Sequence, residues 1–289
     1  MKRRRPWWIE FPGLLAAYYL YEYGFRIFVA GSTPAAARNA RRVIAMERAI
    51  GLYHEADIQK AFLGHHLFIE FWDIYYGTIH FVMPVVGLIW LWRRFPDRYL
   101  RWRNTLAATI LFALIGFAAI PLMPPRLLPA RYHFVDTEAT IGGQGILDQG
   151  AMKDVGNQYA AMPSLHIAWS AWCAFAMVPV IRRRWLKVLT AAYPFATLFA
   201  VVVTANHYIL DGAGGLVALG LGYAAAVGWE RADPLGRRRA KALEPKAQVG
   251  NGAADQNSPC LTPATGSATT TSPASRPSSS GSAGRPRDG

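Results

Sequence analysis

Six apolar runs, each close to the roughly 20 residues that a helix needs to cross a bilayer, are the feature that most constrains this chain. They occupy residues 11–30, 74–92, 106–123, 164–181, 186–204 and 207–229. In lipid, backbone polar groups must be paired within the protein, and a helix pairs them within one segment. The sequence therefore predicts an all-α integral membrane protein built as a six-transmembrane-helix bundle.

The composition agrees with a membrane location, because 52% of the residues are hydrophobic and only 17% are charged. The net charge of +13 would, in a soluble protein, suggest a nucleic-acid partner. Two cysteines, Cys173 and Cys260, are too few for a disulfide framework or a cysteine zinc cluster.

The basic residues alternate from side to side of the apolar runs. Of the 31 Lys and Arg, 22 lie in the segments 1–10, 93–105, 182–187 and 230–289. Segments 31–73 and 124–163 carry as many acidic as basic residues, or more. By the positive-inside rule we expect both termini in the cytoplasm of a multi-pass plasma-membrane protein. The charge is then a topology signal, and no nucleic-acid partner is expected.

The segments between and beyond the runs have their own signatures. In 31–73, apolar residues recur at roughly helical spacing, which predicts an amphipathic helix on the outer face that either shapes lipid access or simply covers the bundle. From about Glu244 the Pro-, Ser- and Thr-rich composition predicts a disordered tail. The expected organisation is a basic N-terminus (1–10), two spans with the interfacial helix (11–105), a catalytic core (106–229) and a mostly disordered cytoplasmic tail (230–289).

Three polar clusters fall at the outer ends of the runs, where ionisable residues are costly and usually functional. Pro163 suits the first turn of a helix, Ser164 can cap it, and His166 follows. His207 and Asp211 are four residues apart and share a face. Two helix N-termini with free amides would then face one spot, which is a binding site for an anion such as phosphate.

Arg126, at the end of the first cluster (residues 121–126), can clamp that anion through its guanidinium group. A histidine held by an aspartate is an oriented nucleophile or base, as His207 would be with Asp211. A second histidine, His166, can protonate the leaving oxygen. The residues therefore predict phosphoryl transfer without a metal or another cofactor.

At these positions the sequence resembles the type 2 phosphatidic acid phosphatase superfamily, and within it the branch that includes fungal inositol phosphorylceramide synthase. The Pro-Ser-x-His signature matches Pro163, Ser164 and His166, and His-x-x-x-Asp matches His207 and Asp211. The resemblance implies a six-helix core with an extracytoplasmic active site. It also implies that His207 forms a phosphohistidine, that Asp211 orients it, and that His166 is the general acid.

The chain departs from the phosphatase branch of that superfamily at several positions. Arg126 aligns with the Arg of the first signature, but Ala119 replaces its Lys and Leu127 its Pro. The Ser-Arg pair expected upstream of the last histidine is Ala200 and Val201. Pro-Pro-Arg at 124–126 is instead associated with the inositol phosphorylceramide synthase branch.

The missing cations bear on the substrate, because a phosphomonoester carries nearly two charges and a phosphodiester carries one. With Arg126 as the only cation that the motifs guarantee, we expect a preference for a lipid phosphodiester and transfer of its head group to an alcohol acceptor. Arg131 and Lys153 are possible auxiliary cations.

Two classes of function remain open. One is a membrane lipid phosphatase or phosphotransferase, with Arg126 and Ser164 binding phosphate; the other is a non-catalytic anionic-lipid binder or transporter. The His207–Asp211 pair favours the enzyme, because Lys or Arg would serve a binder better. Other polar or small residues have simpler roles in packing, hydration, ion pairing or close helix contact: His65, His66, His80, the pair Glu22 and Arg26, and Gly212, Gly214 and Gly215.

Overall fold

The computed structural model describes residues 12, 33–141 and 159–232, all within one compact unit that spans residues 1–242. The predicted basic N-terminus, the Glu22–Arg26 pair and the predicted tail lie outside the described residues, as does the first predicted span apart from Pro12.

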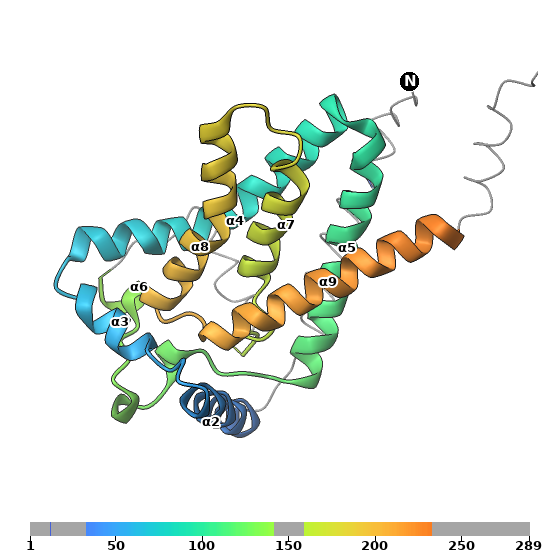
Figure 1. Cartoon of the computed structure of the whole chain (residues 1–289). Helices are drawn as coiled ribbons and strands as arrows, with labels where there is room; N and C mark the ends of the chain where they lie inside the picture. The colour runs from blue at the N-terminus through green and yellow to red at the C-terminus, as the bar shows by residue number, and fades with distance from the viewer. Residues whose placement is uncertain (1–11, 13–32, 142–158, 233–289) are drawn as a thin grey trace, which may run out of the picture. The chain divides into compact units, whose positions relative to one another are not determined.

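Five helices make the bundle shown in Figure 1: α4 (His66–Arg94), α5 (Pro96–Ala119), α7 (Leu165–Met177), α8 (Arg184–Val203) and α9 (Ile209–Ala232). Helix α5 packs along α9, and α7 lies against α4, α8 and α9. The smaller elements are α2 (Thr33–Ala49), α3 (Glu55–Phe62), the 3₁₀ turns η1 (Pro125–Leu127) and η2 (Ala130–Tyr132), and α6 (Thr137–Thr140). No β-strand occurs among the described residues, so the all-α class is confirmed for them.

Four helices are long and apolar enough to cross a membrane, namely α4, α5, α8 and α9. Helix α7 is apolar but has only 13 residues, because the chain leaves the helix after Met177, just before Pro179. The predicted fourth span, 164–181, is therefore longer than the helix that forms. The third predicted span was also misplaced: its helix begins at Pro96 and ends at Ala119, just before Pro121.

Segment 31–73 does not form the single amphipathic helix that its spacing predicts. It contains α2, α3 and the first two turns of α4. Val43 and Ile44 of α2 are buried, whereas Met46 and Ile50 are exposed. The segment breaks at Gly51, which has a φ of +72° that favours glycine over residues with a side chain.

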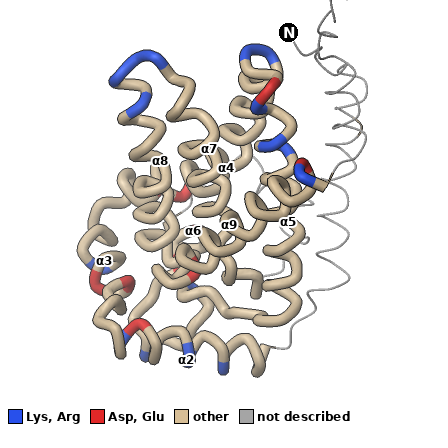
Figure 2. Tube along the Cα trace, turned by 45° about the vertical axis from the view of Figure 1, so that its right-hand side comes forward, with Lys and Arg blue, Asp and Glu red and all other residues tan. Residues whose placement is uncertain are grey.

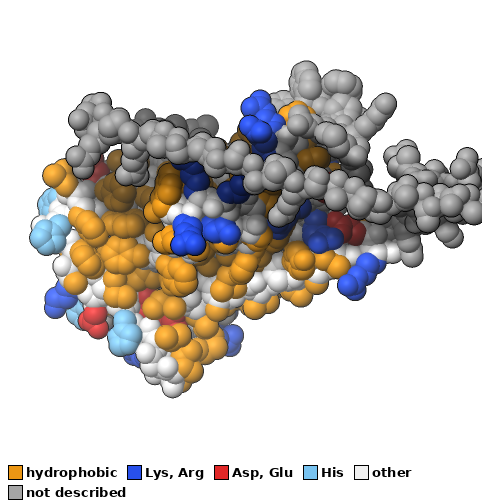
Figure 3. Space-filling view, turned by 45° about the horizontal axis from the view of Figure 1, so that its top comes forward, with side chains coloured by type: hydrophobic (Ala, Val, Ile, Leu, Met, Phe, Trp, Pro, Cys, Tyr) orange, Lys and Arg blue, Asp and Glu red, His pale blue; other side chains and the backbone are white. Residues whose placement is uncertain are grey.

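Large hydrophobic side chains cover much of the outer surface of the bundle, and Figure 3 shows them spread over one broad face. The most exposed include Leu67 on α4, Phe195 on α8 and Trp229 on α9. A soluble protein rarely exposes so much apolar surface, whereas lipid removes it from water. This surface and the four long apolar helices identify a multi-pass membrane protein.

Basic residues occur at both ends of the bundle, but they clearly outnumber acidic residues at only one of them. Figure 2 shows Lys and Arg at the α4–α5 and α7–α8 connections, with α2 and α3 at the opposite end. An ion pair between Arg101 on α5 and Glu230 on α9, 2.8 Å long, places the end of α9 beside the start of α5. The alternation of charge along the sequence thus corresponds to two ends of the bundle.

Close packing between α5 and α9 depends on a small residue. A Cβ at Gly222 of α9 would overlap the hydroxyl of Thr109 and the neighbouring α5 backbone. Glycine at this position lets the two helices approach closely, which is a common basis of helix contact in membranes.

Candidate active site

The starts of α7 and α9 lie side by side. Ser164 caps α7, its Oγ accepting a hydrogen bond from the Ile167 amide over 3.5 Å. The Ser164 amide donates to the Asp211 carbonyl in the first turn of α9, over 3.0 Å. Gly215, one turn further along α9, has no side chain where the Ser164 carbonyl lies. This contact brings together the second and third polar clusters of the sequence.

His207 lies in the turn between α8 and α9, before the first residue of α9. Its amide donates to the Val201 carbonyl, and Ala205 turns the chain with a φ of +54°. The ring Nδ1 is 2.9 Å from the Ala161 carbonyl and 3.3 Å from Asp211 Oδ2. A carbonyl can only accept, so Nδ1 carries the proton and Nε2 carries the free lone pair.

Asp211 holds this imidazole from a fully buried position. Its Oδ2 also accepts the amide N–H of Tyr208, 3.0 Å away. The amide and the imidazole both donate to Asp211 Oδ2, and this fixes the orientation of the His207 ring. The predicted pairing of His207 with Asp211 is therefore present as a direct contact.

His166, in the first turn of α7, faces the lone pair of His207. The distance from His166 Nδ1 to His207 Nε2 is 3.2 Å, and the ring centroids are 5.2 Å apart. Because His207 Nε2 accepts, His166 Nδ1 donates in this contact. An anion entering between the two rings would meet both nitrogens.

Arg126 reaches the same region from the loop after α5. Its amide donates to the Ala205 carbonyl over 2.9 Å, which fastens this loop to the turn that carries His207. The guanidinium Nη1 lies 3.1 Å from Glu138 Oε2 and 3.4 Å from Asp136 Oδ2. Burial lowers the pKa of Arg126, but these carboxylates more than offset it and the pKa is raised, so the side chain stays charged.

The profile of the PAP2 superfamily matches residues 41–225. The chain belongs to the PAP2 superfamily. No curated protein and no solved structure matched it. PAP2 members are phosphoester hydrolases and phosphotransferases. Membership therefore supports an enzyme with a lipid phosphatase type of activity. The matched residues run from α2 to α9 and include Arg126, His166, His207 and Asp211.

Of the other residues predicted for the candidate site, Ser164 forms the predicted helix cap, Arg131 lies at the surface and Lys153 is not described. Ser164 is fully buried and its hydroxyl is used as the α7 cap, while Pro163 precedes that cap and is not in the first turn. Arg131 is exposed, with its guanidinium 5.2 Å from the ring centre of Tyr132. Lys153 lies outside the described residues. Within the described ranges, no group of three or more His, Cys, Asp or Glu residues is arranged to hold a metal ion.

The amides at the start of α9 are not free, contrary to the sequence-based expectation. The Ile209 amide donates to Glu55 Oε1 over 3.0 Å. The Leu210 amide donates to Glu47 Oε1 over 2.7 Å. Both acids come from segment 31–73, which was expected either to shape lipid access or to cover the bundle. Their contact with α9 depends on tertiary packing alone.

Helix α4 adds two rings that the sequence analysis left outside the PAP2 site. Tyr76 stacks on His166 with centroids 4.4 Å apart, and His80 lies 4.0 Å from the same ring. The spacing of four between Tyr76 and His80 puts both on one face of α4. This spacing could have indicated that the two rings act together. The sequence did not show that they would pack against His166 of α7.

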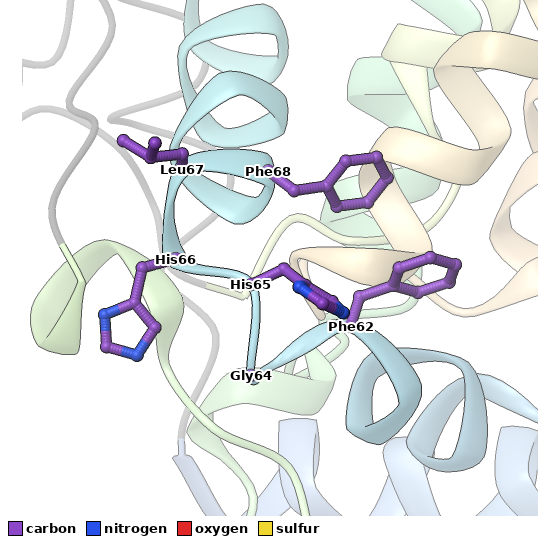
Figure 4. Close-up of a pocket in the computed structure, with 6 residues that line it drawn as sticks. All are labelled: Phe62, Gly64, His65, His66, Leu67 and Phe68. Carbon is purple, nitrogen blue, oxygen red and sulfur yellow. The ribbon is translucent and has the colours of Figure 1, made fainter.

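A separate pocket of about 540 Å³ lies at the α3–α4 connection and shares no lining residue with the histidine pair. In Figure 4 the rings of Phe62 and Phe68 point to one side of the connection, and His66 and Leu67 to the other. His65 and His66 are exposed, which agrees with the expectation of hydration for both.

Proposed function

We propose that this protein is a membrane lipid phosphatase or phosphotransferase that acts through a phosphohistidine on His207. The observation that carries the proposal is the position of the His207 ring. Its Nδ1 faces the Ala161 carbonyl and Asp211, so the lone pair is on Nε2, directed at His166. A non-catalytic binder has no need of an imidazole held in one tautomer.

In the first step, the substrate phosphate enters between the two histidine rings. His207 Nε2 attacks phosphorus, and the bond from phosphorus to the leaving oxygen breaks. His166, protonated at this stage, gives its proton to that oxygen and releases an alcohol. Asp211 balances the positive charge that forms on the phosphorylated imidazole, and Arg126 balances charge on the phosphoryl oxygens.

In the second step, neutral His166 takes a proton from an incoming hydroxyl, whose oxygen attacks phosphorus. The phosphorus–nitrogen bond breaks and restores His207. Water gives a phosphatase, and an alcohol gives a phosphotransferase as in the inositol phosphorylceramide synthase branch. Since the basic connections lie at the opposite end of the bundle from α2 and α3, the positive-inside rule assigns the site to the extracytoplasmic side.

The test compares wild-type protein, His207→Ala, His166→Ala and Asp211→Asn, purified in detergent and assayed with labelled lipid phosphates and phosphodiesters with and without alcohols. We expect each histidine variant to lose at least about 100-fold in kcat, because each removes a covalent or proton-transfer step. Asp211→Asn should keep the fold and lose turnover. Activity should persist in EDTA. Near-normal turnover by His207→Ala would reject the mechanism.

The second comparison concerns substrate charge. We propose a preference for a lipid phosphodiester, supported by the two carboxylates that already pair with Arg126. The measurement is kcat/KM for a monoester and its matching diester in wild type, Arg131→Ala and Lys153→Ala. A wild-type advantage of about tenfold or more on the monoester, lost in either variant, would reverse the assignment.

A further inference from the structure

Two buried carboxyl groups from different helices end on the first turn of α9. Glu47 comes from α2 and Glu55 from α3, and both side chains are fully buried. As described above, they accept the amides of Leu210 and Ile209 through one oxygen each. Negative or partly negative groups at this position interact favourably with the positive end of the helix dipole.

The surroundings of the second oxygen of each carboxyl group indicate that the pair holds a proton. Glu47 Oε2 and Glu55 Oε2 are both buried, and neither has another hydrogen-bond partner among the described residues. The two side chains lie within hydrogen-bonding reach of each other. Two unprotonated carboxylates so close together would repel each other in a site shielded from water. A proton held by one of the two carboxyl groups removes this repulsion.

The surroundings of the pair favour keeping that proton. Burial, the hydrogen bond with Glu55, and the nearby charges of Glu55 and Asp211 raise the pKa of Glu47 to about 9. The other titratable groups that face the pair are Tyr53, which has the guanidinium of Arg48 4.7 Å from its ring centre, and Tyr208. The guanidinium of Arg48 therefore lies over the ring of Tyr53.

The pair is connected to the candidate catalytic residues through consecutive backbone amides. The amides of residues 208, 209 and 210 are bound by Asp211, Glu55 and Glu47 in turn. The same Asp211 oxygen that accepts the Tyr208 amide also accepts His207 Nδ1. A rotation of the first turn of α9 would therefore change the His207–Asp211 contact.

We propose that Glu47 and Glu55 are positioning residues that hold the first turn of α9, and with it the His207–Asp211 pair, in register for attack on phosphorus. This inference rests on the proposed function, since it assigns a purpose to the geometry of that pair. Neither carboxyl group contacts the reacting atoms. Their effect is on the rate of the chemical step rather than on substrate binding.

The experiment uses the full-length protein in detergent and compares Glu47→Ala, Glu47→Gln and Glu55→Ala, with Asp57→Ala as control. Asp57 is an exposed acid on α3, two residues from Glu55. We expect both alanine variants to lose about tenfold or more in kcat with KM within about twofold of wild type. Glu47→Gln should retain most of kcat, because its amide mimics the protonated acid. Asp57→Ala should behave as wild type.

The pH profile separates positioning from general support of the fold. As pH rises toward 9, the carboxyl group of Glu47 loses its proton in wild type, whereas the amide of Glu47→Gln does not titrate. The ratio of the kcat of Glu47→Gln to that of wild type should therefore rise. If the alanine variants do not fold, this ratio still decides. A ratio independent of pH, or a wild-type kcat in Glu47→Ala, would overturn the inference. Activity that survives in His207→Ala would instead overturn the proposed function.

Discussion

The charge around Arg126 is the residue-scale property on which the proposed choice of phosphate depends. The sequence suggested one fixed cation, but Asp136 and Glu138 lie against its guanidinium and oppose its charge. A doubly charged phosphate entering here would meet two carboxylates as well as the arginine. Such repulsion is strong where water is partly excluded, and it supports the proposed preference for a phosphodiester.

Neutralising both acids should therefore change the preference. In the double variant Asp136→Asn, Glu138→Gln we expect the ratio of monoester to diester kcat/KM to rise by about tenfold, because Arg126 is then free to face the phosphate. The measurement is that ratio in matched lipid substrates. An unchanged ratio would show that these carboxylates do not set the charge preference. Asp57→Ala serves as the control for removal of an unrelated acid.

At the scale of elements, the contact between the starts of α7 and α9 decides whether the histidines meet. His166 belongs to α7 and His207 to the turn before α9, and the amide of Ser164 joins the two helices. Gly215 makes this contact possible, because a methyl group there would overlap the Ser164 carbonyl. Backbone atoms cannot move aside as a flexible side chain can.

Gly215→Ala should separate the two helix starts. We expect a loss of about tenfold or more in kcat and a lower melting temperature, since overpacking costs roughly 1–3 kcal/mol. Gly220→Ala is the matched control on α9, because a Cβ there meets nothing within 4 Å. Its activity should equal that of wild type. A Gly215→Ala protein as active as Gly220→Ala would contradict the assigned helix contact.

The Glu47–Glu55 pair also predicts how stability depends on pH. The pKa of Glu47 is raised from 4.5 to about 9 in the folded protein, so the folded state holds a proton that the unfolded state has released. The stabilisation is complete below about pH 4.5 and is lost as pH rises toward 9. Thermal unfolding in detergent from pH 5 to 9 should show a steeper decline in wild type than in Glu47→Gln. Equal slopes would contradict the raised pKa.

At the scale of the whole molecule, the distribution of charge between the two ends of the bundle predicts its orientation in the membrane. The basic α7–α8 connection is expected in the cytoplasm and the loop after α5 outside. Single cysteines at exposed positions Arg184 and Ala130, in a protein lacking Cys173 and Cys260, can be labelled from outside with an impermeant thiol reagent. We expect labelling at Ala130 alone. Labelling at Arg184 alone would invert the orientation and place the site in the cytoplasm.

The sequence by itself determined the parts of this protein that depend on local pattern. Hydropathy over windows of helix length predicted membrane helices, although not that α7 stops after 13 residues. The spacing of His207 and Asp211, and the cap at Ser164, predicted the contacts that form there. These features could be predicted because the interacting groups are within four residues of one another.

Tertiary structure alone decided the surroundings of these residues. Tyr76 of α4 stacks on His166, Glu138 of α6 pairs with Arg126, and Glu47 reaches Leu210 across 163 positions of sequence. Helix periodicity shows which side of a helix is apolar, but it does not specify which neighbour that side will meet. Such contacts are fixed by how the helices pack. The sequence therefore identified the candidate reacting groups, and the packing determined which residues hold them and which charges lie beside them.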